Sequence, residues 1–181
     1  GIAVCGLGHA HPAVREALCD LAGSLVHTSI LYQIAAQTEL GARLTALAGM
    51  DRVFFGNSGA EANEAAIKLA RLHGHHQSVE KPAILVMENS FHGRTLATLT
   101  ATGNRKVQAG FEPLVQGFVR VPYDDLAAVE TAGANRHDLV AILVEPIQGE
   151  GGIRVPAADY LPRLREICDR HGWLLMLDEI Q

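Results

Sequence analysis

Four clusters of glycine and polar residues follow apolar runs along the 181-residue chain. They read GNSGAE after Phe55, NSFHGR after Met87, EPIQGEGG after Val144 and DEIQ after Leu177. In a parallel sheet, ligands bind beyond the carboxyl ends of the strands. We therefore expect the four clusters to lie at one edge of a sheet and to form a single site.

The first cluster has the residue types of an anion site. Ser58 and Glu61 have the S-x-x-E spacing of a capping box, which predicts that a helix begins here. Free N–H groups at a helix N-terminus, together with glycine and a serine hydroxyl, bind phosphate well. A well-capped helix without a ligand explains the same residues, so this motif alone leaves both interpretations open. The GxxxxGK[ST] sequence of a phosphate-binding P-loop is absent.

The second cluster contains three side chains that a site can use. Arg94 suits bidentate capture of a carboxylate, although an ordinary surface charge is the alternative. Phe91 either packs in the core or stacks on a flat ligand. His92 is either a general base or a hydrogen-bonded structural histidine, and we favour the structural role.

Acidic residues mark the other two clusters. Asp178 closes the most apolar strand, so its carboxylate needs a hydrogen-bond partner or a cation to remain charged. It either caps a loop or pairs with a cationic ring nitrogen, which is the more informative partner. Glu145 and Glu150 flank a turn, and a glycosidase pair would require a defined separation between them. The histidines of the HGHH segment that begins at His73 fit a solvated helix end better than a metal site.

Short apolar runs typical of strands alternate along the chain with segments in which apolar residues recur at helical spacing. These are the elements that must position the four clusters. This alternation predicts an α/β fold with a mostly parallel sheet and helices on both faces. Residues 1–50 read as an N-terminal helical and loop segment, and residues 51–181 as the α/β part. The predicted strands are Arg52–Phe55, Ala83–Met87, Gly117–Val121, Leu139–Val144 and Trp173–Asp178, and the predicted helices are Pro12–Gly23, Ala35–Ala48, Ser58–His73, Asp124–Ala132 and Ala157–His171.

Composition excludes several classes of protein. The chain has 15 Lys and Arg against 20 Asp and Glu, a formal net charge of −5, so we expect no nucleic-acid partner. Its apolar runs are too short for a membrane helix, so we expect no membrane partner. Three cysteines without a CxxC pair favour a reducing cytoplasm over a secreted disulfide scaffold.

Longer segments around the clusters carry a family resemblance. They are GIAVCGLGHAHP, FFGNSGAEANEAAIKLAR, NSFHGRTLATLTATG, GFEPLVQGFVRVPYDDL, VEPIQGEGGI and LLMLDEIQ, in this order along the whole chain. Together they resemble the class III (subgroup II) pyridoxal-phosphate aminotransferases, and within that family the members that act on acetylornithine. The resemblance implies the large domain of a fold-type I pyridoxal-phosphate transferase, present here only in part.

The resemblance also implies a set of cofactor-binding residues for pyridoxal 5'-phosphate. The turn of Ser58, Gly59 and Ala60 holds the phosphate, Phe91 stacks on the ring, Asp178 pairs with the ring nitrogen, Ile180 packs on the opposite face and Gln181 hydrogen-bonds the ring hydroxyl. For the substrate, Arg94 takes the α-carboxylate of the acetylated amino acid. Glu150 acts as a gate that pairs with a distal arginine, and Glu145 is a supporting residue.

The implied reaction is transfer of the ω-amino group of N2-acetylornithine to 2-oxoglutarate, which gives glutamate, in arginine biosynthesis. It needs a Schiff-base lysine, and none of Lys68, Lys81 and Lys106 matches the family's lysine motif. We therefore expect that lysine beyond Gln181, no catalytic residue within these 181 residues, and an inactive isolated chain. The full-length protein is expected to be a cytoplasmic homodimer.

Alternatives remain open from the sequence. Within the family, succinyldiaminopimelate, ornithine and 4-aminobutyrate are alternative substrates, and Arg94 in the FHGR motif favours acetylornithine. The alternative to an enzyme is a non-catalytic remnant that binds a phosphorylated ligand.

Overall fold

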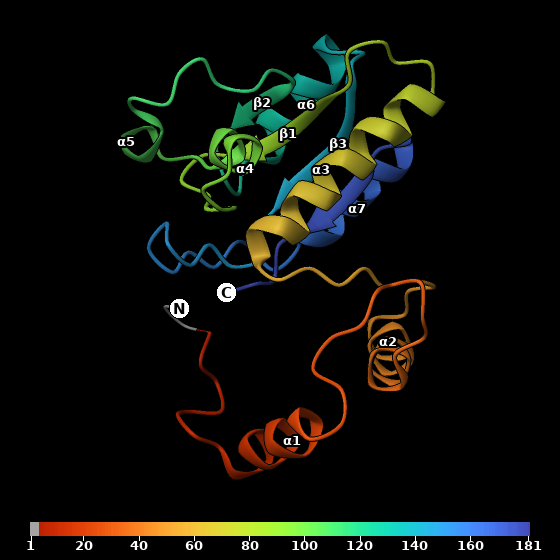
Figure 1. Cartoon of the computed structure of the whole chain (residues 1–181). Helices are drawn as coiled ribbons and strands as arrows, with labels where there is room; N and C mark the ends of the chain where they lie inside the picture. The colour runs from red at the N-terminus through yellow and green to blue at the C-terminus, as the bar shows by residue number, and fades with distance from the viewer. Residues whose placement is uncertain (1–3) are drawn as a thin grey trace. The chain divides into compact units, whose positions relative to one another are not determined.

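The computed structural model describes residues 4–181, so the first three residues of the opening motif and of the predicted N-terminal segment lie outside the described residues. The chain has two compact units, Gly1–Phe55 and Gly56–Gln181. The first contains α1 (Pro12–Ala22) and α2 (Ala35–Ala48) (Figure 1). The predicted boundary at residue 50 stays a prediction.

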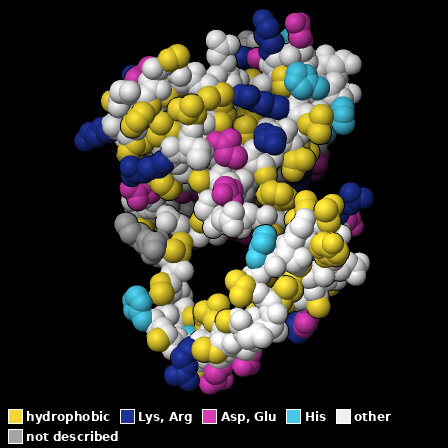
Figure 2. Space-filling model, in the orientation of Figure 1, with side chains coloured by type: hydrophobic (Ala, Val, Ile, Leu, Met, Phe, Trp, Pro, Cys, Tyr) yellow, Lys and Arg dark blue, Asp and Glu magenta, His cyan; other side chains and the backbone are white. Residues whose placement is uncertain are grey.

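The first unit has little core of its own. Neither α1 nor α2 has a buried residue, and large apolar side chains are exposed, among them Val26 at 85% and Ile30 at 93%. Figure 2 shows hydrophobic side chains at the surface of this unit. Helix α2 has the predicted bounds and is capped by Gly49, with φ of 64°. Helix α1 begins at the predicted Pro12 and ends at Ala22, one residue before the predicted Gly23.

The predicted strand Arg52–Phe55 is wrong. These residues have no regular secondary structure, and Phe54 is 70% exposed. The apolar run has the composition of a strand, but a strand needs a neighbour to accept its backbone hydrogen bonds. No other segment of residues 4–181 pairs with it.

The second unit is built on a parallel sheet of four strands. They are β1 (Ala83–Met87), β2 (Phe118–Val121), β3 (Leu139–Val144) and β4 (Leu174–Leu177), in the order β2-β1-β3-β4 (Figure 1). Every neighbouring pair is parallel. The carboxyl ends of β1, β3 and β4 therefore lie at the same edge, as the sequence predicts.

Helices cover both faces of this sheet, which confirms the predicted fold class. The α-helices of the unit are α3 (Gly59–His76), α4 (Leu96–Ala101), α5 (Arg105–Gln108), α6 (Leu126–Asn135) and α7 (Tyr160–His171). Residues of α6 and α7 pack on one face, and residues of α3 and α4 pack on the other. Helices α4 and α5 were not predicted, because they are too short to show a helical period, and α3 extends three residues beyond its predicted end at His73.

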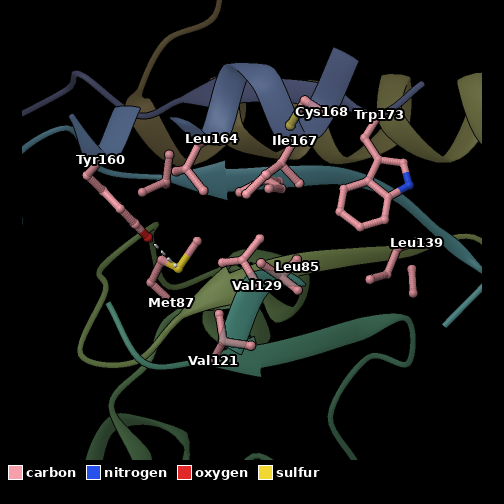
Figure 3. Packing of buried hydrophobic residues seen from close by; sticks show 13 residues of the cluster. Leu85, Met87, Val121, Val129, Leu139, Tyr160, Leu164, Ile167, Cys168 and Trp173 are labelled. Carbon is pink, nitrogen blue, oxygen red and sulfur yellow. Dashed lines mark hydrogen bonds between the residues drawn. The ribbon is translucent and has the colours of Figure 1, made fainter. Parts of the chain in front are cut away.

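Alternate side chains of β1 pack into two hydrophobic clusters, one on each face of the sheet. Leu85 and Met87 point into the cluster with α7, whereas Ile84 and Val86 point into the cluster with α3. Figure 3 shows the first cluster, in which the Tyr160 hydroxyl donates to the Met87 sulfur at 3.4 Å. Because β1 is buried on both faces, the loop after Met87 starts from a rigid position.

No helix within residues 4–181 is long and apolar enough to cross a membrane.

Candidate functional site

The N-terminus of α3 offers unpaired backbone donors. Ser58 is the N-cap, and its hydroxyl accepts a hydrogen bond from the N–H of Glu61 at 3.2 Å. The carboxylate of Glu61 accepts from the N–H of Asn57 at 2.6 Å, one residue before the partner that a standard capping box uses. The N–H groups of Gly59 and Ala60 have no acceptor within the described residues, so they can bind an anion.

The loop after β1 is fitted closely against this helix. Gly93 has φ of 128°, and a Cβ atom there would lie 2.7 Å from Thr98 Oγ1 and 3.0 Å from Ala60 Cβ. A side chain at this position would therefore push the loop away from α3. The backbone N–H of Phe91 donates to Glu145 at 3.0 Å, which ties the same loop to the end of β3.

Asp178 follows β4, and its N–H donates to the carbonyl of Val144 at 2.9 Å. Its side chain is 5% exposed. Oδ2 accepts from Asn63 Nδ2 and His92 Nδ1, each at 2.8 Å, and Oδ1 accepts from the N–H of Ile180 at 3.2 Å. Burial by itself raises the pKa of Asp178, but the hydrogen bonds from His92 and Asn63 outweigh it, so the pKa lies below its ordinary value. Asp178 is therefore ionised at neutral pH.

Glu145 is the second buried carboxylate of the site. Burial raises its pKa, and the hydrogen bond from the N–H of Phe91 opposes this increase. Its other oxygen accepts from the N–H of Gly149 at 3.4 Å. Because both bonds go to backbone groups, Glu145 joins the loops that follow β1 and β3, in line with the supporting role expected for it.

These groups enclose a cavity of about 300 Å³, a volume suited to a small ligand. Most of the predicted site residues line it: Gly59, Ala60, Phe91, Arg94, Asp178, Ile180 and Gln181. Ile180 lies directly against the start of α3, because a Cβ atom on Gly59 would be 2.8 Å from its side chain. Figure 1 shows the C-terminus beside this end of α3.

Two predicted site residues lie outside the lining. Ser58 caps α3 next to the cavity, and Glu150 is exposed on the turn of residues 149–153. Among the described residues, Glu150 has no ion-pair partner. Its role as a gate stays a prediction, as do the individual roles of the other site residues.

Asn63 also lines the cavity, although it was not among the predicted site residues. Its amide donates to the carbonyl of His92 at 2.9 Å as well as to Asp178. The signal was present, since Asn63 follows Gly59 by four residues and so lies on the same face of the helix. His92 is 2% exposed and hydrogen-bonded, as the favoured structural interpretation predicts.

The histidines His73, His75 and His76 lie in the last turn of α3. Within residues 4–181, no group of three or more histidine, cysteine or acidic side chains is arranged to hold a metal ion. The position of these histidines in the last turn of α3 agrees with the helix-end part of the interpretation.

The donor set fits a phosphorylated heterocycle. Free N–H groups at one end of the cavity suit a phosphate, and an ionised, buried carboxylate suits a protonated ring nitrogen. The guanidinium of Arg94 lies 6.0 Å from the centre of the Phe91 ring, which also lines the cavity. This cation pairs with no carboxylate of residues 4–181. A second anionic group can bind there.

Comparison with known sequences gives the same family along the whole chain. The model of the family described as aminotransferase class-III matches residues 1–181. The acetylornithine aminotransferase of Nitrosomonas europaea is 65% identical over all 181 residues, which are 46% of its length. Acetylornithine aminotransferase 1 of Bordetella pertussis is 49% identical over 181 residues, again 46% of its length. The chain thus spans about half the length of the curated relatives that it matches.

Solved structures agree with the fold. N-acetylornithine aminotransferase from Stenotrophomonas maltophilia superposes with a TM-score of 0.81 and 39% identity, over 98% of this chain and 43% of that one. Ornithine aminotransferase from Toxoplasma gondii superposes with a TM-score of 0.89 and 34% identity, over 94% of this chain and 41% of that one.

Proposed function

The chain belongs to the class-III aminotransferase family, and from this premise we propose that the whole protein transfers the ω-amino group of N2-acetylornithine to 2-oxoglutarate. The observation that carries the proposal is the 65% identity to an acetylornithine aminotransferase over all 181 residues. Class III aminotransferases use pyridoxal 5'-phosphate, and the cavity has donors that suit each end of this cofactor.

We assign cofactor contacts to residues on three elements. The N–H groups of Gly59 and Ala60, at the Ser58-capped start of α3, bind the phosphate. Phe91 and Ile180 contact the two faces of the ring, and Gln181 hydrogen-bonds the ring hydroxyl. This assignment is supported by the position of all but Ser58 in the lining of one cavity.

Asp178 holds a proton on the ring nitrogen in this proposal. The support is its depressed pKa and its burial, because an ionised carboxylate in a site of low polarity pairs strongly with a cation. When bound, the cofactor supplies an electron sink for the carbon that loses a proton. Asp178 makes that sink more effective by keeping the ring positively charged.

Arg94 binds the substrate α-carboxylate. In N2-acetylornithine this carboxylate lies at the end of the molecule opposite the reacting ω-amine, and the acylated α-nitrogen carries no positive charge that would repel a guanidinium. The support is that Arg94 lines the cavity and pairs with no carboxylate of the described residues. Glu150 acts as a gate on a distal arginine when 2-oxoglutarate enters.

The reaction also needs a lysine that forms a covalent bond with the cofactor. Lys68, Lys81 and Lys106 do not line the cavity. We therefore assign that lysine to residues outside these 181 and expect the isolated chain not to transaminate. We further propose that the whole protein is a homodimer in the cytoplasm.

The test is steady-state kinetics on the protein at its natural length. We expect a higher kcat/KM for N2-acetylornithine than for ornithine, succinyldiaminopimelate or 4-aminobutyrate. Arg94→Leu should lower kcat/KM for N2-acetylornithine by about ten- to a hundredfold, the usual cost of one charge-assisted contact. Arg43→Leu is the control, since Arg43 pairs with Glu39 on the surface of α2, and it should change kcat/KM little.

The results separate the alternatives. A preference for another amine would reassign the substrate and leave the family unchanged. Cofactor binding without any turnover would favour the non-catalytic remnant instead.

A further inference from the structure

His92 is the most enclosed titratable side chain of the site. Its side chain is 0% exposed, and Nδ1 lies 2.8 Å from Asp178 Oδ2. The other ring nitrogen, Nε2, is buried and has no hydrogen-bond partner within the described residues. A buried polar atom without a partner carries an energetic cost, so its retention calls for a reason at the site.

The position of the ring proton follows from these contacts. An ionised carboxylate only accepts hydrogen bonds, so the proton toward Asp178 is on His92 Nδ1. His92 therefore donates from Nδ1 to the Oδ2 atom of Asp178.

Asn63 donates to the same oxygen of Asp178. Its amide donates to the His92 carbonyl at 2.9 Å and to Asp178 Oδ2 at 2.8 Å. Oδ2 therefore receives two donors from two elements, α3 and the loop after β1. Among the described residues, Oδ1 accepts only from the N–H of Ile180, at 3.2 Å, so one of its lone pairs remains for a partner in the cavity.

We propose that His92 and Asn63 are positioning residues, which hold Asp178 Oδ2 so that Oδ1 is directed at the ring nitrogen of the cofactor. This inference rests on the proposed function and extends it to two residues without an assigned part in the reaction. Neither residue donates to the reacting atoms. Both act through the orientation and charge of Asp178.

The test compares two ligands that lack the aldehyde and so bind without a lysine. They are pyridoxine 5'-phosphate and its 1-deaza analogue, in which carbon replaces the ring nitrogen. Their dissociation constants are measured by calorimetry on the cofactor-free protein at its natural length. The wild-type protein should bind pyridoxine 5'-phosphate more tightly, because only this ligand can pair with Asp178.

Two variants of similar size separate the role of Nδ1 from packing. In His92→Asn the amide nitrogen takes the place of Nδ1, whereas in His92→Gln it takes the place of Nε2 and misses Asp178. We expect His92→Gln to lower the preference for pyridoxine 5'-phosphate by about tenfold, the effect of one hydrogen bond to a charge. His92→Asn should retain the preference. Asn63→Ala should lower it in the same way from an independent position.

Each other outcome overturns a defined part. Equal weakening of both ligands by His92→Gln and Asn63→Ala would make these residues merely structural. If His92→Asn and His92→Gln have the same ligand preference, or if no variant changes it, the Nδ1 donor is not the cause of the preference for pyridoxine 5'-phosphate. If the wild-type protein binds both ligands equally, Asp178 does not pair with the ring nitrogen and the positioning proposal is wrong. If it binds neither ligand, the cofactor site of the proposed function is wrong.

Discussion

Gly93 lies in the loop after β1 and packs against the start of α3. Its replacement by alanine tests how closely this loop and helix fit together. A Cβ atom there would lie 2.7 Å from Thr98 Oγ1, 3.0 Å from Ala60 Cβ and 3.1 Å from Thr98 Cβ. The backbone also has φ of 128°, a conformation that L-residues rarely adopt. The substitution therefore has two separate costs.

The magnitudes follow from the two causes. A non-glycine residue in a sparsely populated conformation costs about 1–3 kcal/mol. Insertion of an atom into a packed region costs about 1–3 kcal/mol more. We expect Gly93→Ala to lower the free energy of unfolding by about 2–6 kcal/mol, a large part of a domain's usual stability of about 5–15 kcal/mol.

Gly110→Ala is the matched control. Gly110 has φ of 89°, but no heavy atom lies within 4 Å of its added Cβ. This variant should therefore show the backbone cost alone. Urea unfolding of the wild-type protein and both variants measures the difference. Equal losses for Gly93→Ala and Gly110→Ala would refute the close fit, and so would a Gly93→Ala variant as stable as the wild type.

Two further predictions concern the core and the ionised site. Leu164 is 0% exposed, so Leu164→Ala should lower the free energy of unfolding, measured with urea, by about 2–5 kcal/mol. Leu72 is 51% exposed, so the control Leu72→Ala should change it by about 0.5 kcal/mol or less. Equal losses would contradict the described core. Because the folded-state pKa of Asp178 lies below its ordinary value of 3.8, its ionised form stabilises the fold above that pH, and this contribution is lost as the pH falls through the folded-state pKa. The wild-type free energy of unfolding should therefore fall more steeply below about pH 4 than that of Asp178→Asn, and parallel pH profiles would contradict the depressed pKa.

Sequence alone predicts much of the second unit because its signals are local. The run of Leu139–Val144 is continuously apolar, and β3 occupies these same residues between covering layers. Polar clusters at strand ends meet because parallel strands share a direction. The predicted strand Arg52–Phe55 failed because strand formation depends on a distant partner, which composition does not reveal.

The contacts within the site were less accessible to sequence reasoning. The Ser58 cap was predicted because capping acts over three residues. The bonds of Asp178 to Asn63 and His92 span separations of 115 and 86 residues, so only the folded chain reveals them. The sequence predicts that the Asp178 carboxylate needs a hydrogen-bond partner or a cation. The structure adds that Asn63 and His92 both donate to one of its two oxygens.

The central claim is that one cavity, between the start of α3 and Asp178, binds pyridoxal 5'-phosphate. The most direct measurement is a crystal structure of the protein at its natural length with this cofactor bound. We predict the phosphate on the N–H groups of Gly59 and Ala60 and the ring nitrogen on the Asp178 carboxylate. A cofactor bound elsewhere, or bound here with its ring nitrogen away from Asp178, would contradict the account.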